Sequence, residues 1–149
     1  SSMLNKAKRQ IELFKNLVDR TRTVAYCKGD QEVYFTMDGY TAFSLPEMDV
    51  CLDLGKMQML ESMKELFVIS EKDQEVSKTK TIRELRRGEF GYEMKCDQFS
   101  VFAQKTLFDK YYDGHRLFCE SPESPIKLVS NVTGKVEALV LPVRVREGE

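Results

Sequence analysis

The last third of the chain alternates β-rich runs with turn signals, and no other feature constrains the fold as strongly. Asp113-Gly114 and Thr133-Gly134 separate these runs, and Gly-containing pairs between β-rich segments are typical of hairpin loops. The last run contains Pro142, which cannot donate a ladder hydrogen bond, so we expect that part at a sheet edge or bulge. The alternation predicts one helix and four strands: a strand at 92–99, a helix at 103–112, and strands at 116–120, 126–130 and 136–145.

The N-terminal segment has the apolar spacing of a surface helix. Leu4, Ala7, Ile11, Phe14 and Val18 recur every three or four residues, which places them on one stripe of a helix. The opposite face carries charged residues of both signs with a small basic excess. We therefore predict a helix that packs this apolar stripe against a sheet.

Short strands are predicted after this helix. Val33, Phe35 and Met37 alternate with polar or amphipathic neighbours, the period-two pattern of a half-buried strand. Asp38-Gly39 fits a two-residue hairpin loop, because both central residues of a type I′ turn need positive φ. The predicted strands in this part of the chain are 23–27, 31–37, 40–45 and 49–54.

The middle of the chain is expected to connect two halves. Residues 56–67 have apolar side chains at helical spacing and predict a helix. Residues 70–80 are polar and nearly free of large apolar side chains, so we expect an exposed, mobile connection within a charged loop at 70–88.

Length and composition bound the class of protein. At 149 residues we expect a single domain, residues 1–149, with two pseudo-repeats at about 4–54 and 92–146. The formal net charge of −1 gives no global attraction to nucleic acid, so any such binding must come from local patches. No apolar run is long enough to span a membrane and no signal peptide is visible, so we expect a cytoplasmic protein with no membrane partner. The four cysteines, none in a C-x-x-C pair, predict buried reduced thiols.

No motif in the sequence supports catalysis, a metal or a cofactor. His115 is the only histidine, which excludes two-histidine metal motifs, and its position after Asp113-Gly114 favours a turn residue. No phosphate-binding loop, dinucleotide fingerprint or serine-nucleophile elbow is present. Asp109 and Asp113 are one helical turn apart, but two carboxylates alone are weak support for a cation site. We therefore expect a protein that is not an enzyme and has no catalytic residues, metal site or cofactor.

Two groups of basic residues are candidate phosphate contacts. One lies on the charged face of the N-terminal helix, and the other lies between residues 78 and 87, where only Glu84 opposes it. Clustered Lys and Arg side chains neutralise phosphates and bind nucleic acid in a salt-dependent way. The alternative is a solvated charged surface with no ligand. The candidate nucleic-acid-binding residues are Lys8, Arg9, Lys15, Arg20, Lys78, Lys80, Arg83, Arg86 and Arg87.

The order of a helix followed by strands occurs twice and resembles one domain of a DNA sliding clamp, the processivity factor of polymerases. Three segments look like parts of such a domain: the turn at Thr36-Met37-Asp38-Gly39-Tyr40-Thr41-Ala42, the strand opening at Ser124-Pro125-Ile126, and the closing strand at Leu139-Val140-Leu141-Pro142-Val143-Arg144-Val145. The resemblance implies an α+β fold of two pseudo-repeated units, with the helices on one side of antiparallel sheets.

The same resemblance implies a non-enzymatic protein that docks DNA, a replication-type partner protein, or both. In clamps the closing strand lines a pocket for short peptide motifs, which here points to Pro142, Val143, Arg144 and Val145 as partner-binding residues. A ring would require homo-oligomers of this chain. The alternative function is a protein-only interaction module, such as an inhibitor or assembly factor of a phage or mobile element, that does not bind DNA.

Overall fold

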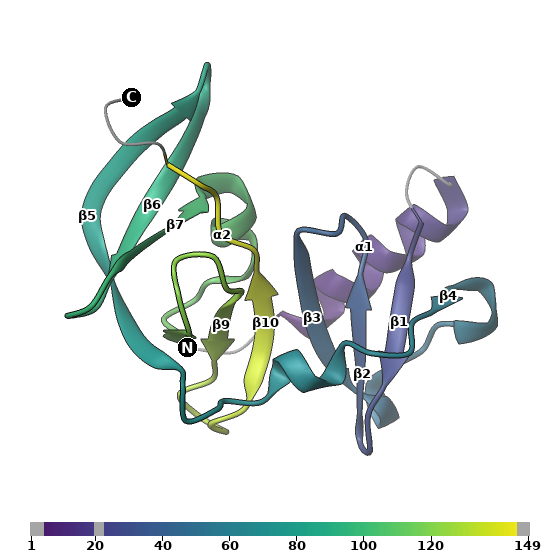
Figure 1. Cartoon of the computed structure of the whole chain (residues 1–149). Helices are drawn as coiled ribbons and strands as arrows, with labels where there is room; N and C mark the ends of the chain where they lie inside the picture. The colour runs from purple at the N-terminus through teal and green to yellow at the C-terminus, as the bar shows by residue number, and fades with distance from the viewer. Residues whose placement is uncertain (1–4, 20–22, 146–149) are drawn as a thin grey trace.

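The computed structural model describes residues 5–19 and 23–145, which form two α-helices and one ten-stranded mixed sheet (Figure 1). The strand order across the sheet is β4-β1-β2-β3-β10-β9-β8-β5-β6-β7, and only the β1–β4 pair is parallel. The elements in chain order are α1 (Lys6–Asp19), β1 (Ala25–Lys28), β2 (Glu32–Thr36), β3 (Thr41–Pro46), η1 (Glu47–Asp49), η2 (Leu54–Lys56), β4 (Gln58–Met59), η3 (Lys64–Phe67), β5 (Gln74–Arg86), β6 (Glu89–Lys95), β7 (Ser100–Gln104), α2 (Lys105–Tyr111), β8 (Arg116–Cys119), β9 (Ile126–Val129) and β10 (Val136–Val140).

The predicted clamp-like α+β fold with two helix-and-strand units is wrong. Each half does contain a helix followed by three antiparallel strands, but β3 pairs with β10, so the strands of both halves belong to one sheet. The middle segment adds strands to that sheet instead of linking two units. Element order predicts local neighbours, whereas the pairing of strand edges depends on contacts between residues about 100 positions apart, such as Ala138 with Phe43.

Helix α1 forms where the sequence predicts it, but it turns a different face to the core. Asn5 caps its first turn, because the Asn5 Oδ1 accepts a hydrogen bond from the Lys8 backbone N–H at 3.0 Å. Leu13 and Arg9 are the buried residues of the helix. Ile11, Phe14 and Val18, expected to pack on the sheet, are more than half exposed.

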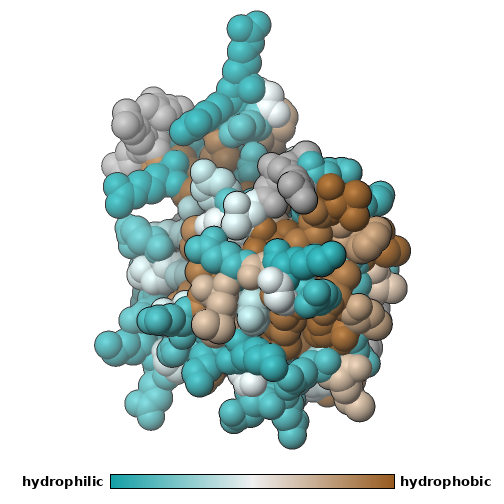
Figure 2. Space-filling model, turned by 90° about the vertical axis from the view of Figure 1, so that its right-hand side faces the viewer, coloured by the Kyte–Doolittle hydropathy of each residue, from teal (hydrophilic) through white to brown (hydrophobic). Residues whose placement is uncertain are grey.

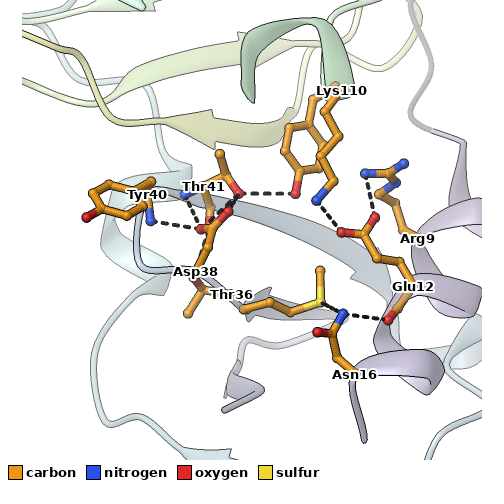
Figure 3. Close-up of polar contacts among 10 residues, drawn as sticks. Arg9, Glu12, Asn16, Thr36, Asp38, Tyr40, Thr41 and Lys110 are labelled. Carbon is orange, nitrogen blue, oxygen red and sulfur yellow. Dashed lines mark hydrogen bonds and ion pairs between the residues drawn. The ribbon is translucent and has the colours of Figure 1, made fainter. Parts of the chain in front are cut away.

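Buried polar contacts explain this orientation (Figure 3). Arg9, which is 2% exposed, forms an ion pair with Glu12 at 3.0 Å. Its guanidinium carbon lies 5.0 Å from the centroid of the Tyr111 ring on α2. Lys110 of α2 also forms an ion pair with Glu12. The charged face of α1 is therefore anchored to α2, and the apolar stripe is turned outward.

The helix predicted at residues 56–67 is absent. The chain instead makes two short 3-10 turns, η2 and η3, on either side of the two-residue strand β4. The Gln58 N–H donates to the carbonyl of Val24, just before β1, at 3.0 Å. The Leu60 N–H donates to the carbonyl of Tyr26, within β1, at 2.8 Å. These tertiary hydrogen bonds compete successfully with the local helical pattern.

The mobile connection expected at residues 70–80 is also wrong, because this segment begins the longest strand of the sheet. Strand β5 pairs with β8 over Gln74–Val76 and with β6 from Ser77 to Arg86. A strand of polar residues is stable here because its backbone is hydrogen-bonded along its length. Its first residues pair with β8, and the remaining residues pair with β6.

Two apolar clusters lie on opposite faces of the sheet. The larger one contains Leu13 of α1, Phe108 of α2 and the inward residues of most strands, among them Phe35, as its alternation predicts. The smaller cluster lies under the segment 63–69, where Phe67 stacks on Tyr34 with ring centroids 4.3 Å apart. Buried Lys127 holds this segment in place.

Lys127 Nζ donates to the Val68 carbonyl and to Asp73 Oδ2, both at 2.7 Å.

Among the four cysteines, Cys27 and Cys119 are buried as predicted, and Cys96 is partly buried. Cys51 is exposed, because it lies in irregular chain after η1 instead of in the strand predicted at 49–54.

The last third follows the prediction most closely. Strand β6 ends at Lys95, and Ala103 belongs to the additional strand β7, so helix α2 begins two residues later than predicted. Strand β10 ends at Val140, before Pro142. The Val143 N–H then donates to the Phe102 carbonyl at 2.8 Å, which joins the segment after β10 to β7 at the far end of the sheet.

Candidate nucleic-acid and partner surfaces

The candidate basic residues separate into two groups that the structure does not bring together. Lys8 and Lys15 are exposed on α1, whereas the five basic residues between 78 and 87 lie on β5 and the turn after it (Figure 1). Arg9 is not a surface residue, because its guanidinium is buried against Glu12 and Tyr111, so its assignment to a nucleic-acid contact is wrong. Arg20 lies outside the described residues.

The second group lies on a segment that we call the β5–β6 arm and define as residues 77–91; its outer part is a two-stranded ribbon, because β7 pairs with β6 only from Gly91 onward. It projects from the body of the molecule and ends in a turn at Arg87-Gly88, where Gly88 has φ of 80° (Figure 1). A positive φ at this position suits glycine, which has no Cβ to clash with the backbone. Lys78, Lys80 and Arg86 are exposed along the arm, as is Arg87 at its tip, while Arg83 is half-buried.

A wide bulge interrupts the arm near its base. Lys78 pairs with Met94 and Ile82 pairs with Tyr92, so residues 79–81 lie opposite the single residue Glu93. Thr79 stabilises the bulge: its hydroxyl donates to Glu93 Oε1 at 3.1 Å and accepts from the Thr81 N–H at 3.0 Å. Bulges increase the local twist of a ribbon, so the outer part of the arm turns relative to the sheet.

Below the bulge, a polar network fixes the ring of Tyr92. Its hydroxyl donates to Asp109 at 2.8 Å, and Lys105 also donates to Asp109 at 2.8 Å. Burial and the bonded Asp109 carboxylate raise the pKa of Tyr92, and the hydrogen bond to Asp109 raises the pKa of Lys105. The Lys78 ammonium lies 4.2 Å from the ring centroid, a cation–π contact that positions this lysine at the base of the arm.

The outer part of the arm has uncompensated positive charge. Among the described residues, Lys80, Arg86 and Arg87 form no ion pair, and Glu84 and Glu89 are the only carboxylates between residues 77 and 91. Phe90 and Ile82 are also exposed there, at 41% and 53%. The arm therefore offers exposed cations and exposed apolar side chains on one slender element.

The predicted partner-binding residues lie after β10. Pro142, Val143 and Val145 are half-buried and Arg144 is exposed. Because the Val143 N–H already bonds to Phe102, that group is not available for pairing with a peptide. Partner binding at Pro142–Val145 stays a prediction, with Arg144 the side chain most accessible to a partner.

Sequence reasoning missed a groove on the face of the sheet that carries the 63–69 segment. It has a volume of about 820 Å³ and is lined by Tyr34, Lys64, Phe67, Lys135 and Glu137, among others. The signal that could have found it is the alternation of β2, which directs Tyr34 away from the main core. Its opposing charges, with Lys135 3.8 Å from Glu32, identify no ligand class.

His115 directly follows the bend at Asp113-Gly114, and its side chain is buried. Its Nδ1 accepts from the Asp113 N–H at 3.0 Å, so its Nε2 carries the proton and donates to Glu137 at 2.8 Å. Burial raises the pKa of the Cys119 thiol to about 12, which makes it a poor nucleophile. Within residues 5–19 and 23–145, no three or more His, Cys, Asp or Glu side chains gather in a group that could hold a metal ion.

No protein-family model, curated protein or solved structure matches this chain at a significant level. In the described part of the chain, neither helix has the length and apolar character needed to cross a bilayer.

Proposed function

We propose that this protein is a non-enzymatic binding protein that docks on nucleic acid through the β5–β6 arm. The observation that carries the proposal is the presence of five basic side chains along strand β5 and the turn at its end, three of them without an ion pair among the described residues. Such side chains keep their charge available for phosphates, and counterion release then drives binding.

The dimensions of the arm suit a nucleic-acid groove. The arm contains the ten residues of β5 from Ser77 to Arg86, which corresponds to about 33 Å at about 3.3 Å per residue. The major groove of B-form DNA admits a two-stranded ribbon as well as it admits a helix. The five basic residues of the arm are placed to contact phosphates along such a groove: Lys78 and Lys80 nearer the body, Arg83 between them and the tip, and Arg86 and Arg87 at the tip.

Exposed Phe90 extends what the arm could contact. It lies opposite Glu84 and three residues after Arg87 at the tip. An aromatic ring beside cations can stack on an unpaired base, as in proteins that bind single strands. Duplex is the form we propose because the ribbon width fits the groove, and a preference for single strands would reassign Phe90 as the main contact.

A direct binding measurement tests the proposal. A labelled 20-base-pair duplex should bind at low salt, and five phosphate contacts should lower the affinity about 500-fold between about 50 and 200 mM salt. The double variant Arg86→Gln/Arg87→Gln should weaken binding at least tenfold. The control Lys56→Gln/Lys64→Gln makes the same change in net charge on other exposed residues and should leave affinity unchanged. Absence of duplex binding at low salt would exclude this function.

The second candidate function is a protein-only interaction module. It is favoured by the exposed apolar stripe of α1, because nucleic-acid binding does not require an apolar stripe on a helix. We place either role in the cytoplasm, where cysteines such as the four free thiols of this chain stay reduced.

A further inference from the structure

Helix α1 exposes a continuous apolar row, which we call the α1 seam and define as Ala7, Ile11, Phe14 and Val18. All four residues are exposed, and the last three have exposed fractions of 56%, 57% and 61%. Figure 2 shows a broad apolar area on the face of the molecule at the α1, β1 and β4 end. Isolated exposed apolar residues are normal, but an ordered row of them on one helix marks an interaction surface.

The seam cannot reach the core of this protein. Arg9 lies two positions from both Ala7 and Ile11, which is about 200° around the helix axis. Because Arg9 is buried and anchored to Glu12 and Tyr111, the seam points to the opposite side. Leu13 fills the remaining space against the core. A rotation of α1 that buried the seam would therefore remove Arg9 from its partners.

The spacing of the seam is that of a coiled coil. Ala7, Ile11, Phe14 and Val18 are separated by four, three and four residues, the alternation of a and d positions in a heptad. A row limited to these positions is too narrow for packing on a sheet but matches the width of one partner helix.

The charges beside the seam select the kind of helix. Lys8 and Lys15 follow Ala7 and Phe14 at equivalent heptad positions, and both are exposed without an ion pair among the described residues. The other flank carries Gln10, whose side chain is already bonded to the Asp49 carbonyl at 2.7 Å and to the Cys51 N–H at 3.0 Å. Only the lysine flank is free to select a partner by charge.

We propose that the α1 seam binds an amphipathic helix of a partner protein, with acidic residues flanking the apolar row of that helix. Its carboxylates would lie against Lys8 and Lys15 while its apolar row covers Ile11 and Phe14. This site is separate from the β5–β6 arm and does not depend on nucleic-acid binding.

A second copy of the chain is a poorer occupant of the same surface. In an antiparallel pair of α1 helices, Lys8 of one copy would lie beside Lys15 of the other, because equivalent flanks meet in that arrangement. In a parallel pair, Lys15 of each copy would face Gln10 of the other, whose hydrogen bonds are already made within its own chain. Neither arrangement supplies the missing negative charge.

Two designed peptides test the proposal on the full chain. Both are 21-residue labelled helices with Leu and Ile at a and d positions; one has Glu and the other has Lys at e and g. Fluorescence anisotropy should show at least tenfold tighter binding of the Glu peptide, weakened by added salt. The charge-reversed variant Lys8→Glu/Lys15→Glu should invert the preference between the peptides, a result that general stickiness of the surface cannot produce.

Exposed apolar residues provide the matched controls. Phe14→Ser should weaken binding of the Glu peptide at least tenfold, whereas Met48→Ser, at a residue 91% exposed outside the seam, should not change it. Equal binding of both peptides, or binding of neither, would overturn the proposal. So would light scattering that shows a dimer lost in Phe14→Ser, or seam-dependent binding to phosphatidylserine–phosphatidylcholine vesicles, because a second copy or a membrane would then be the occupant.

Discussion

The guanidinium carbon of Arg9 lies 5.0 Å from the centre of the Tyr111 ring, so a buried cation joins the first helix of the chain to the second. Tyr111 continues the connection to the sheet, because its hydroxyl lies 3.2 Å from the Thr41 hydroxyl (Figure 3). Asp38 receives two further hydrogen bonds there, from the N–H groups of Tyr40 and Thr41. Polar contacts thus hold α1, α2 and the β2–β3 hairpin together above the apolar core.

Replacing Arg9 should destabilise the fold. Arg9→Met removes the ion pair with Glu12 and the cation–π contact with Tyr111; because Glu12 keeps its ion pair with Lys110, we expect a loss of about 2 kcal/mol. Urea unfolding followed by circular dichroism measures the loss. Lys8→Met, on the exposed flank of the same helix, should change the free energy of unfolding by less than about 0.5 kcal/mol. Similar losses in the two variants would show that the Arg9 contacts do not anchor the helix.

Asp38 should matter for stability through its side-chain oxygens. Asp38→Ala leaves the N–H groups of Tyr40 and Thr41 without their acceptor, each now bonded at 2.8 Å, and should cost about 2 kcal/mol. Asp38→Asn keeps an acceptor oxygen and should cost about half as much. Chemical denaturation of both variants tests this, and equal losses would argue that the negative charge, not the hydrogen bonding, is what the turn requires.

The buried thiol of Cys119 should make stability fall at alkaline pH. Its pKa is raised to about 12 by burial, with Cys96 and Asp73 adding to the effect. Between its ordinary value near 9 and this value, the folded protein keeps a proton that the unfolded chain releases, so the free energy of unfolding falls as pH rises. The destabilisation caused by Cys119→Ala should therefore be about 1 kcal/mol smaller at pH 10 than at pH 8. An unchanged difference in urea unfolding would contradict the buried-thiol explanation.

The salt dependence of duplex binding should report the number of arm contacts. Each phosphate contact contributes about 0.9 to the slope of the logarithm of affinity against the logarithm of salt concentration. If Arg86 and Arg87 contact phosphates, Arg86→Gln/Arg87→Gln should reduce the slope by about 2. A loss of affinity with an unchanged slope would mean that these arginines contact bases instead.

Most of the correct predictions concern features that are determined by residues close together in the sequence. The strand at Glu32–Thr36 follows from its period-two alternation. The sequence also located the turn at Asp38-Gly39, where Gly39 has φ of 76°, but the predicted two-residue loop is wrong, because β2 ends at Thr36 and β3 begins only at Thr41. These features depend on residues within about five positions of one another. For the candidate site, the sequence identified the basic cluster at Lys78–Arg87 but placed it in a charged loop instead of on a paired ribbon.

The remaining features depended on which partners the chain found in space. The sequence by itself determined that α1 is a helix with one apolar row, but only the tertiary structure decided that this row faces outward. The physical reason is that a helix can turn only one face to the core. In α1 that face contains Arg9, which contacts Glu12 and Tyr111, so the apolar row on the other side faces outward. Likewise, β5 became a strand because β8 and β6 satisfy its backbone hydrogen bonds, a requirement that its own side chains do not encode.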